Sequence, residues 1–427
     1  MQEKQNTYFA DTKPHYRLLD GLRGVAALMV VWYHVFEGFG FAGAVNGISD
    51  GSITTFNHGY LAVDFFFMLS GFVISYAYYS RWHTSNSSGL TASTTSRSTA
   101  PGDLTLAGFF MRRLIRLHPM VIMGAIIGAI SFCIGGCTNW MGETISWQNI
   151  ALALALGMLL IPAWPGARFD VRGNGEMYPL NGPSWSLFFE YIGNILYALV
   201  IRKLSTKPLK LLTAALGLCY AAFAITNTSG YGNIGVGWTL DHINFPGGLI
   251  RMLFPFTMGT TLHRVLFVKN EKKPCRIIEY LGSLPANLIF ACCTITLFAI
   301  FSVPFLGVSE KFCANGIFEF ICVAVIFPAI VLAAASRSNS SGKGKTINFL
   351  GELSYPLYII HYPVMYLFYS WLIKEKIYSI GECWPIVCGV MLINIAIAYL
   401  CLKLYDQPLR KRAARRLIIT NHSKNHF

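Results

Sequence analysis

The sequence predicts an all-α integral membrane protein, a polytopic bundle of ten transmembrane helices with one additional short helix. Only 13% of the 427 residues are charged and 54% are hydrophobic, whereas soluble domains average roughly 25% charged residues. The mean hydropathy is +0.48, and apolar stretches of about 20 residues, enough to cross a bilayer as a helix, recur along the chain. This composition excludes a disordered chain and argues against an ordinary cytosolic enzyme.

The candidate spans follow one another almost from end to end of the chain. They cover residues 22–39, 59–79, 117–137, 183–203, 208–226, 246–266, 285–306, 316–335, 354–373 and 385–405. A further apolar run, 149–161, has only 13 residues, and runs of about 10–14 residues are more often interfacial or re-entrant than spanning. We therefore expect 149–161 to form the short helix that does not cross.

The distribution of Lys and Arg predicts the orientation. If 149–161 does not cross, the segments on the side of the N-terminus are 1–22, 80–116, 202–210, 264–276, 336–346 and 403–427. They hold 27 of the 34 Lys and Arg residues, the segments on the other side hold 5, and Arg23 and Arg251 lie within spans. Because cytoplasmic loops are enriched in Lys and Arg, both termini are expected in the cytoplasm, 1–21 as the N-terminal segment and 406–427 as a basic tail. We expect a single membrane domain over 1–427, with no appended soluble domain. The net charge of +14 then marks orientation, and we expect no nucleic-acid partner.

Arg23 and His34 are two ionisable residues on the first predicted span. A charged side chain at the bilayer centre costs at least about 2.5–3.5 kcal/mol, so such residues are paired, solvated or functional. The two residues are eleven positions apart, which places them on one helix face about 16 Å apart along the axis. The alternative is an Arg that reaches the interface beside a structural His.

Asp64 and Glu190 are acidic residues expected at the depth of His34. An Asp64 carboxylate next to His34 would orient the imidazole and make it a general base. A structural ion pair is the alternative, and Glu37, one turn beyond His34, is a rival partner. Arg251 is placed to neutralise one of these acids.

Two further groups have a functional and a structural interpretation. Arg113 and Arg116, neighbours on one helix face, can bind phosphates bidentately, or they can be ordinary positive-inside anchors. Ser354, Tyr358 and His361 form a polar stripe that either lines a channel or hydrogen-bonds between helices. The scattered Cys and His residues have no metal-binding spacing, so we expect no metal.

Five stretches, in this order, resemble the motifs of membrane-bound acyltransferase family 3, the O-acyltransferases of polysaccharides and related glycans. They are YRLLDGLRGVAA at 16–27 with His34, VDFFFMLSGF at 63–72 after Gly59, RRLIRLHP at 112–119, WSL at 185–187 with Glu190, and LG at 350–351 leading to His361. Two positions depart from the family pattern: His118 precedes Pro119, where the family usually has an aliphatic or aromatic residue, and Phe189 precedes Glu190, where a polar or small residue is more frequent.

The resemblance implies ten spans with both termini inside, in the inner membrane of a bacterium. It implies transfer of an acyl group, acetyl by default, from cytoplasmic acyl-CoA to a hydroxyl of a cell-surface or exported glycan. We expect His34, Asp64 and Glu190 to be catalytic, either by general-base catalysis or through an acyl-His intermediate. The residues expected to hold the donor are Arg23, Arg113, Arg116, Tyr358 and His361.

Three questions stay open at this stage. The acceptor can be an exopolysaccharide, a lipopolysaccharide, peptidoglycan or a secreted small molecule. The acyl group can also be succinyl or longer, and the oligomeric state is not predicted. A transporter or flippase of a glycan or acylated lipid is the alternative function, because ionisable groups within spans also serve proton-coupled carriers.

Overall fold

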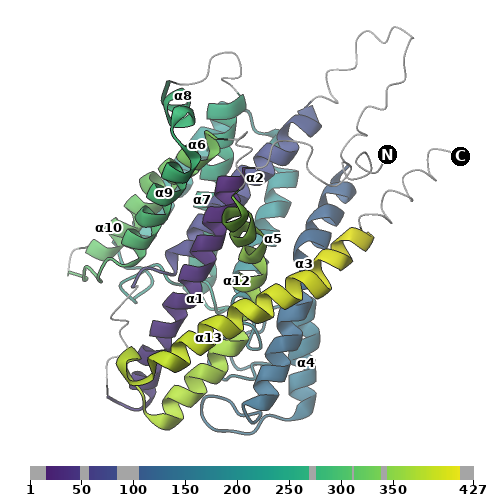
Figure 1. Ribbon diagram of the computed structural model, residues 1–427, viewed down its shortest axis with the longest axis vertical. Coiled ribbons are helices and arrows are strands. Elements are labelled where there is room, and N and C mark those ends of the chain that lie inside the picture. Colours follow the sequence, from purple (N-terminus) through teal and green to yellow (C-terminus); the bar gives the residue numbers. More distant parts are fainter. Residues whose placement is uncertain are drawn as a thin grey trace, which may run out of the picture.

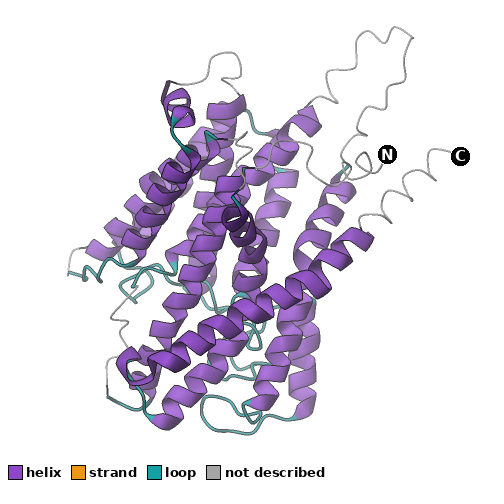
Figure 2. Ribbon diagram, in the orientation of Figure 1, coloured by secondary structure: helices purple, strands orange, loops and turns teal. Residues whose placement is uncertain are grey.

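A computed structural model describes residues 16–48, 57–83, 105–268, 276–309, 312–337 and 344–413. Within these ranges the chain is an assembly of packed helices joined by loops (Figure 1), and no strand is present (Figure 2). The α-helices are α1 (Arg17–Val45), α2 (Leu61–His83), α3 (Leu106–Ile134), α4 (Trp147–Met158), α5 (Ser184–Leu199), α6 (Thr206–Ile225), α7 (Asn244–Leu262), α8 (Arg276–Ser283), α9 (Ala286–Phe301), α10 (Ala314–Ile321), α11 (Phe327–Ala335), α12 (Lys345–Glu375) and α13 (Ile380–Cys401). Short 3₁₀ or π segments extend several of them: η1 (Ile201–Lys203), η2 (His263–Val268), η3 (Cys322–Ile326) and η4 (Leu402–Asp406).

The all-helical prediction is confirmed for the described residues, whereas the count of ten spans is not. Among the described residues, seven helical segments are long and apolar enough to cross a membrane, and there are eight if α8 and α9, bent by 105°, form one broken span. The predicted spans 246–266 and 354–373 lie on α7 and α12, which are not among these segments although both are long helices. Both carry buried polar side chains such as Arg251 and His361, which make their sequences less apolar.

The predicted short helix is present. It is α4, with 12 residues, and its N-cap Ser146 accepts a hydrogen bond from the Asn149 amide at 3.4 Å. Residues 159–183 lead from α4 to α5 as a loop with several turns. This loop matters for function because it contributes side chains to a cavity described below.

The bundle has two ends that differ in charge. α1 begins at the upper side of Figure 1, where α2 ends and α3 begins. We call this the basic side, because Arg17, Arg113 and Arg116 lie at these helix ends. α1 ends and α13 begins at the opposite side (Figure 1).

Glycines allow the central helices to approach closely. α1 packs along α12, and a Cβ atom at Gly24 would lie 2.2 Å from the Leu350 carbonyl oxygen. α2 packs along α7, and a Cβ atom at Gly71 would lie 2.0 Å from the Phe256 carbonyl oxygen. Lipid is as apolar as a leucine side chain, so helices in a membrane associate through such close packing and through hydrogen bonds.

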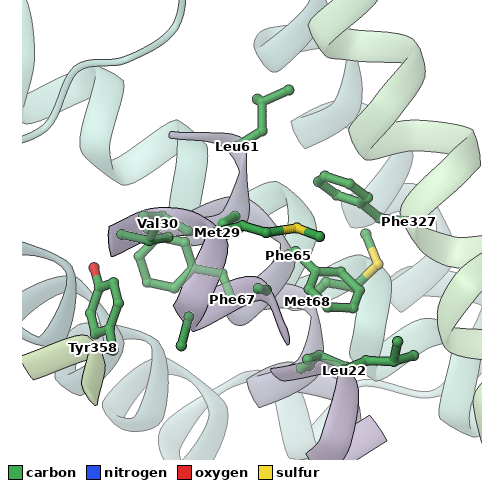
Figure 3. Close-up of a cluster of buried hydrophobic side chains, with 14 of the residues drawn as sticks. Leu22, Met29, Val30, Leu61, Phe65, Phe67, Met68, Phe327 and Tyr358 are labelled. Carbon is green, nitrogen blue, oxygen red and sulfur yellow. The ribbon is translucent and has the colours of Figure 1, made fainter. Parts of the chain in front are cut away.

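A buried apolar cluster fills the space between these helices (Figure 3). Phe65 and Met68 of α2 meet Leu22 of α1 and Phe327 of α11 within it, and all four are completely buried. Tyr358 of α12 lies at one edge of the cluster (Figure 3). The cluster therefore provides a rigid wall beside the polar residues that follow.

Candidate functional site

Two cavities lie inside the bundle and meet at its middle. The first, about 690 Å³, is lined on the basic side by Arg17, Arg23, Arg113, Arg116, Arg410 and Lys411, and we call it the basic cavity. The second, about 290 Å³, is lined by His34, Glu37 and ten aromatic side chains, and we call it the aromatic cavity. Val63 and Tyr358 line both, so the two cavities are neighbours across these two side chains.

The basic cavity gathers cations from three parts of the chain. Arg23 comes from α1 and is paired with Asp20 through Nη1 and Oδ1 at 3.0 Å. Arg113 and Arg116 come from the first half of α3, as the sequence indicated. Arg410 follows η4, on the segment predicted as a basic cytoplasmic tail, and it lines the cavity. Such a group of guanidinium ions suits a ligand with several phosphates.

Glu190 belongs to the basic cavity. Its Oε1 accepts hydrogen bonds from Arg113 Nη2 at 2.8 Å and from Ser70 Oγ at 2.9 Å. The expectation that Glu190 shares a site with His34 is therefore wrong, because the two residues line different cavities. The Nε of Arg113 is buried without a hydrogen-bond partner, so this guanidinium keeps a donor that is not used within the described residues.

His34 is partnered by Glu37 and not by Asp64. Its Nδ1 lies 2.6 Å from Glu37 Oε2, and because a carboxylate only accepts, Nδ1 is the protonated nitrogen and Nε2 the basic one. Glu37 Oε2 also accepts hydrogen bonds from the hydroxyls of Tyr369 at 2.9 Å and Tyr362 at 3.3 Å. The expected pair of Asp64 with His34 is a wrong prediction, and the rival partner Glu37 takes its place.

Asp64 instead pairs with Arg251, which the sequence had placed near one of these acids. Arg251 Nη2 lies 2.7 Å from Asp64 Oδ2, and the two side chains are 1% and 0% exposed. The same guanidinium donates to the carbonyl oxygens of Val236 at 2.7 Å and Tyr60 at 2.9 Å. Tyr220 donates to Asp64 Oδ1 at 3.3 Å. The pair thus joins α2 and α7 and fixes the loop before α7.

The three residues of the predicted polar stripe on α12, Ser354, Tyr358 and His361, do not all line the same cavity. Ser354 and Tyr358 line the basic cavity, and Tyr358 also lines the aromatic cavity. Because Ser186 Oγ donates to the Pro183 carbonyl at 3.0 Å, the Tyr358 hydroxyl donates to Ser186 at 2.7 Å. His361 is not among the residues that line either cavity.

His361 packs directly against His34. The two imidazole rings are stacked with centroids 5.2 Å apart and planes 28° apart. His361 Nδ1 donates to the Tyr358 carbonyl at 2.8 Å, and its buried Nε2 has no hydrogen-bond partner within the described residues. His361 therefore restricts the orientation of the His34 ring from one face.

Comparison with known proteins identifies the family. A sequence model described as "Acyltransferase domain" matches residues 16–403, nearly the whole chain. The chain belongs to acyltransferase family 3. It is an acyltransferase of the membrane-bound, multi-pass kind, and residues of each of its five motifs line the basic cavity. No solved structure matches the chain.

Several curated proteins are similar to this acyltransferase. It is 33% identical to "Protein 2 in picA locus" of Rhizobium radiobacter over 42% of this chain and 80% of that protein. It is 24% identical to the acyltransferase MdmB of Streptomyces mycarofaciens over 81% and 78% of the two chains. It is 23% identical to the O-acetyltransferase OatA of Staphylococcus aureus over 96% of this chain and 59% of that protein, so it spans little more than half of that relative.

The sequence reasoning missed two features of this acyltransferase. The first is a stripe of tyrosines on α12 with spacings of three and four residues: Tyr355, Tyr358, Tyr362, Tyr366 and Tyr369. That spacing is visible in the sequence, but the predicted stripe ended at His361. The second feature is Glu176, a buried residue of the loop before α5, whose carboxylate accepts from the Tyr366 hydroxyl and from Asn174 Nδ2 at 2.8 Å. Burial raises the pKa of Glu176 to about 7.

Metal-ligating side chains do not gather into a cluster in the part of the chain that the structure describes. No group of three or more His, Cys, Asp or Glu side chains is placed there to hold a metal ion.

Proposed function

We propose that this acyltransferase moves an acyl group, acetyl by preference, from acyl-CoA in the basic cavity to a hydroxyl of an exported glycan in the aromatic cavity. The observation that carries the proposal is the meeting of the two cavities at Tyr358 and Val63, with His34 lining the aromatic one. Relatives named O-acetyltransferases support acetyl as the group and oxygen as the acceptor atom.

The donor fits the basic cavity by charge and by shape. Its phosphates would be held by Arg113, Arg116 and Arg410. Arg23, on the same helix as His34, lines the same cavity. The rest of the cavity lining includes apolar side chains such as Phe66 and Phe67, which suit the mostly neutral arm of the donor. The Glu190 carboxylate fixes Arg113, and this assigns Glu190 a role in positioning the donor.

The chemistry falls to His34. Glu37 accepts a hydrogen bond from the Nδ1–H group of His34, so Nε2 is unprotonated. Nε2 can therefore take the proton of the acceptor hydroxyl while the hydroxyl oxygen attacks the thioester carbonyl carbon. The carbon–sulfur bond breaks, and the sulfur leaves with the proton that His34 has taken. In the variant mechanism Nε2 attacks the thioester carbon, the carbon–sulfur bond breaks and the thiolate leaves. The acceptor oxygen then attacks the acyl-His34 intermediate, the carbon–nitrogen bond breaks, and the hydroxyl proton goes to the thiolate. His361 keeps the His34 ring in place by stacking on it.

The orientation follows from the donor. Acyl-CoA is made in the cytoplasm, so the basic side would face the cytoplasm and the aromatic cavity the outer side of a bacterial inner membrane. The excess of Lys and Arg on the predicted cytoplasmic segments supports the same orientation. Both termini would then be cytoplasmic.

Acetyl transfer by the purified protein tests the proposal. The full chain in lipid nanodiscs is incubated with radiolabelled acetyl-CoA and a total glycan extract, and label in the glycan is counted. We expect His34→Ala to abolish transfer and Arg116→Ala to raise the KM for acetyl-CoA at least about tenfold, since each charged hydrogen bond contributes about 1.5–3 kcal/mol. Full activity of both variants would overturn the assignment.

Two exposed residues provide matched controls for these variants. His242 lies in the loop before α7 and Lys207 near the start of α6, and neither lines a cavity. We expect His242→Ala and Lys207→Ala to keep wild-type kinetics. The same experiment separates the enzyme from the carrier alternative, because a transporter without chemistry leaves no covalent label on the glycan.

A further inference from the structure

The aromatic cavity has the lining of a site for a ring with hydroxyl groups. Ten of its twenty lining residues are Trp, Tyr or Phe, against 14% aromatic residues in the whole chain. Trp140, Trp185 and Trp238 reach it from three different parts of the sequence. Its volume of about 290 Å³ is at the small end of ligand pockets, which span about 300–1,000 Å³, so it suits one ring with its substituents.

The charges in this cavity disfavour an anion. Two carboxylates line it, those of Glu37 and Glu176, and Arg251 is the one Lys or Arg among the described lining residues. Arg251 is already engaged by the Asp64 carboxylate and by two backbone carbonyls, so its charge is compensated. His34 is held by Glu37. An anionic ligand would therefore lose its hydration without gaining an unpaired cation.

Glu176 keeps hydrogen-bonding capacity for a ligand. Asn174 donates to Oε1 at 2.8 Å and Tyr366 donates to Oε2, whereas each carboxylate oxygen can accept two hydrogen bonds. Arg172 does not pair with it: its Nε donates to the Pro179 carbonyl at 3.1 Å, and its guanidinium lies over the Tyr366 ring, 3.8 Å from the centroid.

We propose that the aromatic cavity takes an uncharged, hydroxyl-bearing sugar ring and that Glu176 is a positioning residue that accepts a hydrogen bond from one of its hydroxyls. The apolar C–H face of the ring packs on the aromatic side chains, as apolar groups do on aromatic faces, and the acceptor hydroxyl is turned toward His34. A ring with a carboxylate is disfavoured, because it would face Glu37 and ionised Glu176 without an unpaired cation. This inference rests on the proposed function, because it names the acceptor class of that site.

A matched pair of soluble compounds tests the inference by binding alone. Methyl β-D-glucopyranoside and methyl β-D-glucuronide differ only at C6, which is a hydroxymethyl group in the first and a carboxylate in the second. Each is titrated into the full chain in nanodiscs, and the emission of the tryptophans is recorded. We expect saturable quenching by the glucoside and at least tenfold weaker binding of the glucuronide. Equal binding of the two, or no binding of the glucoside, would overturn the proposal.

The role of Glu176 is tested by comparing the KM for the sugar acceptor with the KM for acetyl-CoA in a Glu176 variant. We expect Glu176→Gln to raise the KM for methyl β-D-glucopyranoside about tenfold, to leave the KM for acetyl-CoA unchanged, and to reduce the discrimination against the glucuronide. Tyr366→Phe removes only the hydroxyl that donates to Glu176 and should shift the same KM in the same direction. Glu382→Gln, an exposed acid at the start of α13, is the matched control.

The proposed acetyl transfer and the proposed sugar-ring site can be refuted independently of each other. If the purified protein transfers no acetyl group but binds the glucoside in preference to the glucuronide, the proposed function fails and the ring site stands. If acetyl transfer occurs and Glu176→Gln changes no constant, Glu176 has no positioning role. The unchanged acetyl-CoA KM also shows that the variant is folded.

Discussion

Replacing Asp64 by Asn distinguishes a structural carboxylate from a catalytic one. Sequence reasoning paired Asp64 with His34, whereas the structure pairs it with Arg251 at 2.7 Å. Asp64→Asn keeps the size of the side chain and removes its negative charge. Because Asp64 pairs with Arg251, we expect the effect to appear first in the stability of the bundle and activity to fall only as far as folding does.

The magnitude follows from the burial of the pair. Asp64 and Arg251 are 0% and 1% exposed, so the substitution leaves a guanidinium ion in the interior without its counter-charge. Breaking a buried ion pair from one side costs about 3–5 kcal/mol. Arg251 keeps its hydrogen bonds to the carbonyls of Val236 and Tyr60, which places the expected loss at the lower end of that range.

Equilibrium unfolding in mixed micelles with increasing SDS measures this loss, with circular dichroism as the readout. A double-mutant cycle with Arg251→Gln isolates the pair, and we expect the double variant to be more stable than the sum of the single losses predicts. Glu352→Gln is the control, because the ion pair of Glu352 with Lys403 is solvent-exposed and such pairs contribute about 0–1 kcal/mol. If Asp64→Asn kept the wild-type unfolding midpoint and lost kcat a hundredfold, the structural role would be refuted and Asp64 would be a catalytic residue.

Three other predictions follow from single contacts. Glu37→Gln should lower kcat for acetyl transfer about 10–100-fold with an unchanged KM for acetyl-CoA, because the catalytic imidazole loses the carboxylate that orients it; wild-type kcat would contradict this. Gly71→Ala should lower the SDS unfolding midpoint, since its Cβ would lie 2.0 Å from the Phe256 carbonyl oxygen, whereas Gly389→Ala, with open space around it, should not. Burial raises the pKa of Glu176 to about 7 from an ordinary 4.5, so its protonated form stabilises the fold below about pH 4.5 and this contribution is lost as the pH rises through 7; Glu176→Gln should flatten that part of the stability profile.

The fold class and most helix positions could be predicted because hydropathy reports directly on a bilayer. The short helix at 149–161 was recognised from its length, and the structure has it at Trp147–Met158. The span count was less secure, because α7 and α12 are central helices whose polar residues face protein and not lipid. Their sequences therefore combine the apolar residues of a membrane span with the buried polar residues of a functional site.

Contacts within the site were harder to predict, and the reason is geometric. Residue counting gives the depth of a side chain, but contact also depends on the direction in which it leaves its helix. His34, Asp64 and Glu190 were expected to meet because their depths agreed. In the structure Asp64 pairs with Arg251 and Glu190 pairs with Arg113. Of the acidic residues considered, Glu37, on the same helix, is the one that pairs with His34. Partners three residues apart are fixed by local helix geometry, so they are predictable without knowing the packing.

The separation between the two ends of the donor site constrains which donors the proposed mechanism accepts. Arg23 and His34 are eleven residues apart on α1, about 16 Å along the axis, and Arg116 lines the basic cavity together with Arg23. A donor whose phosphates are held by the arginines must therefore extend to Tyr358, where the two cavities are neighbours, through a long and mostly neutral arm. Acetyl-CoA has such an arm, whereas acetyl phosphate carries its acyl group directly on the phosphate. A phosphate held at Arg116 would keep that acyl group away from His34, so under the proposed mechanism we expect acetyl-CoA, and not acetyl phosphate, to serve as the donor.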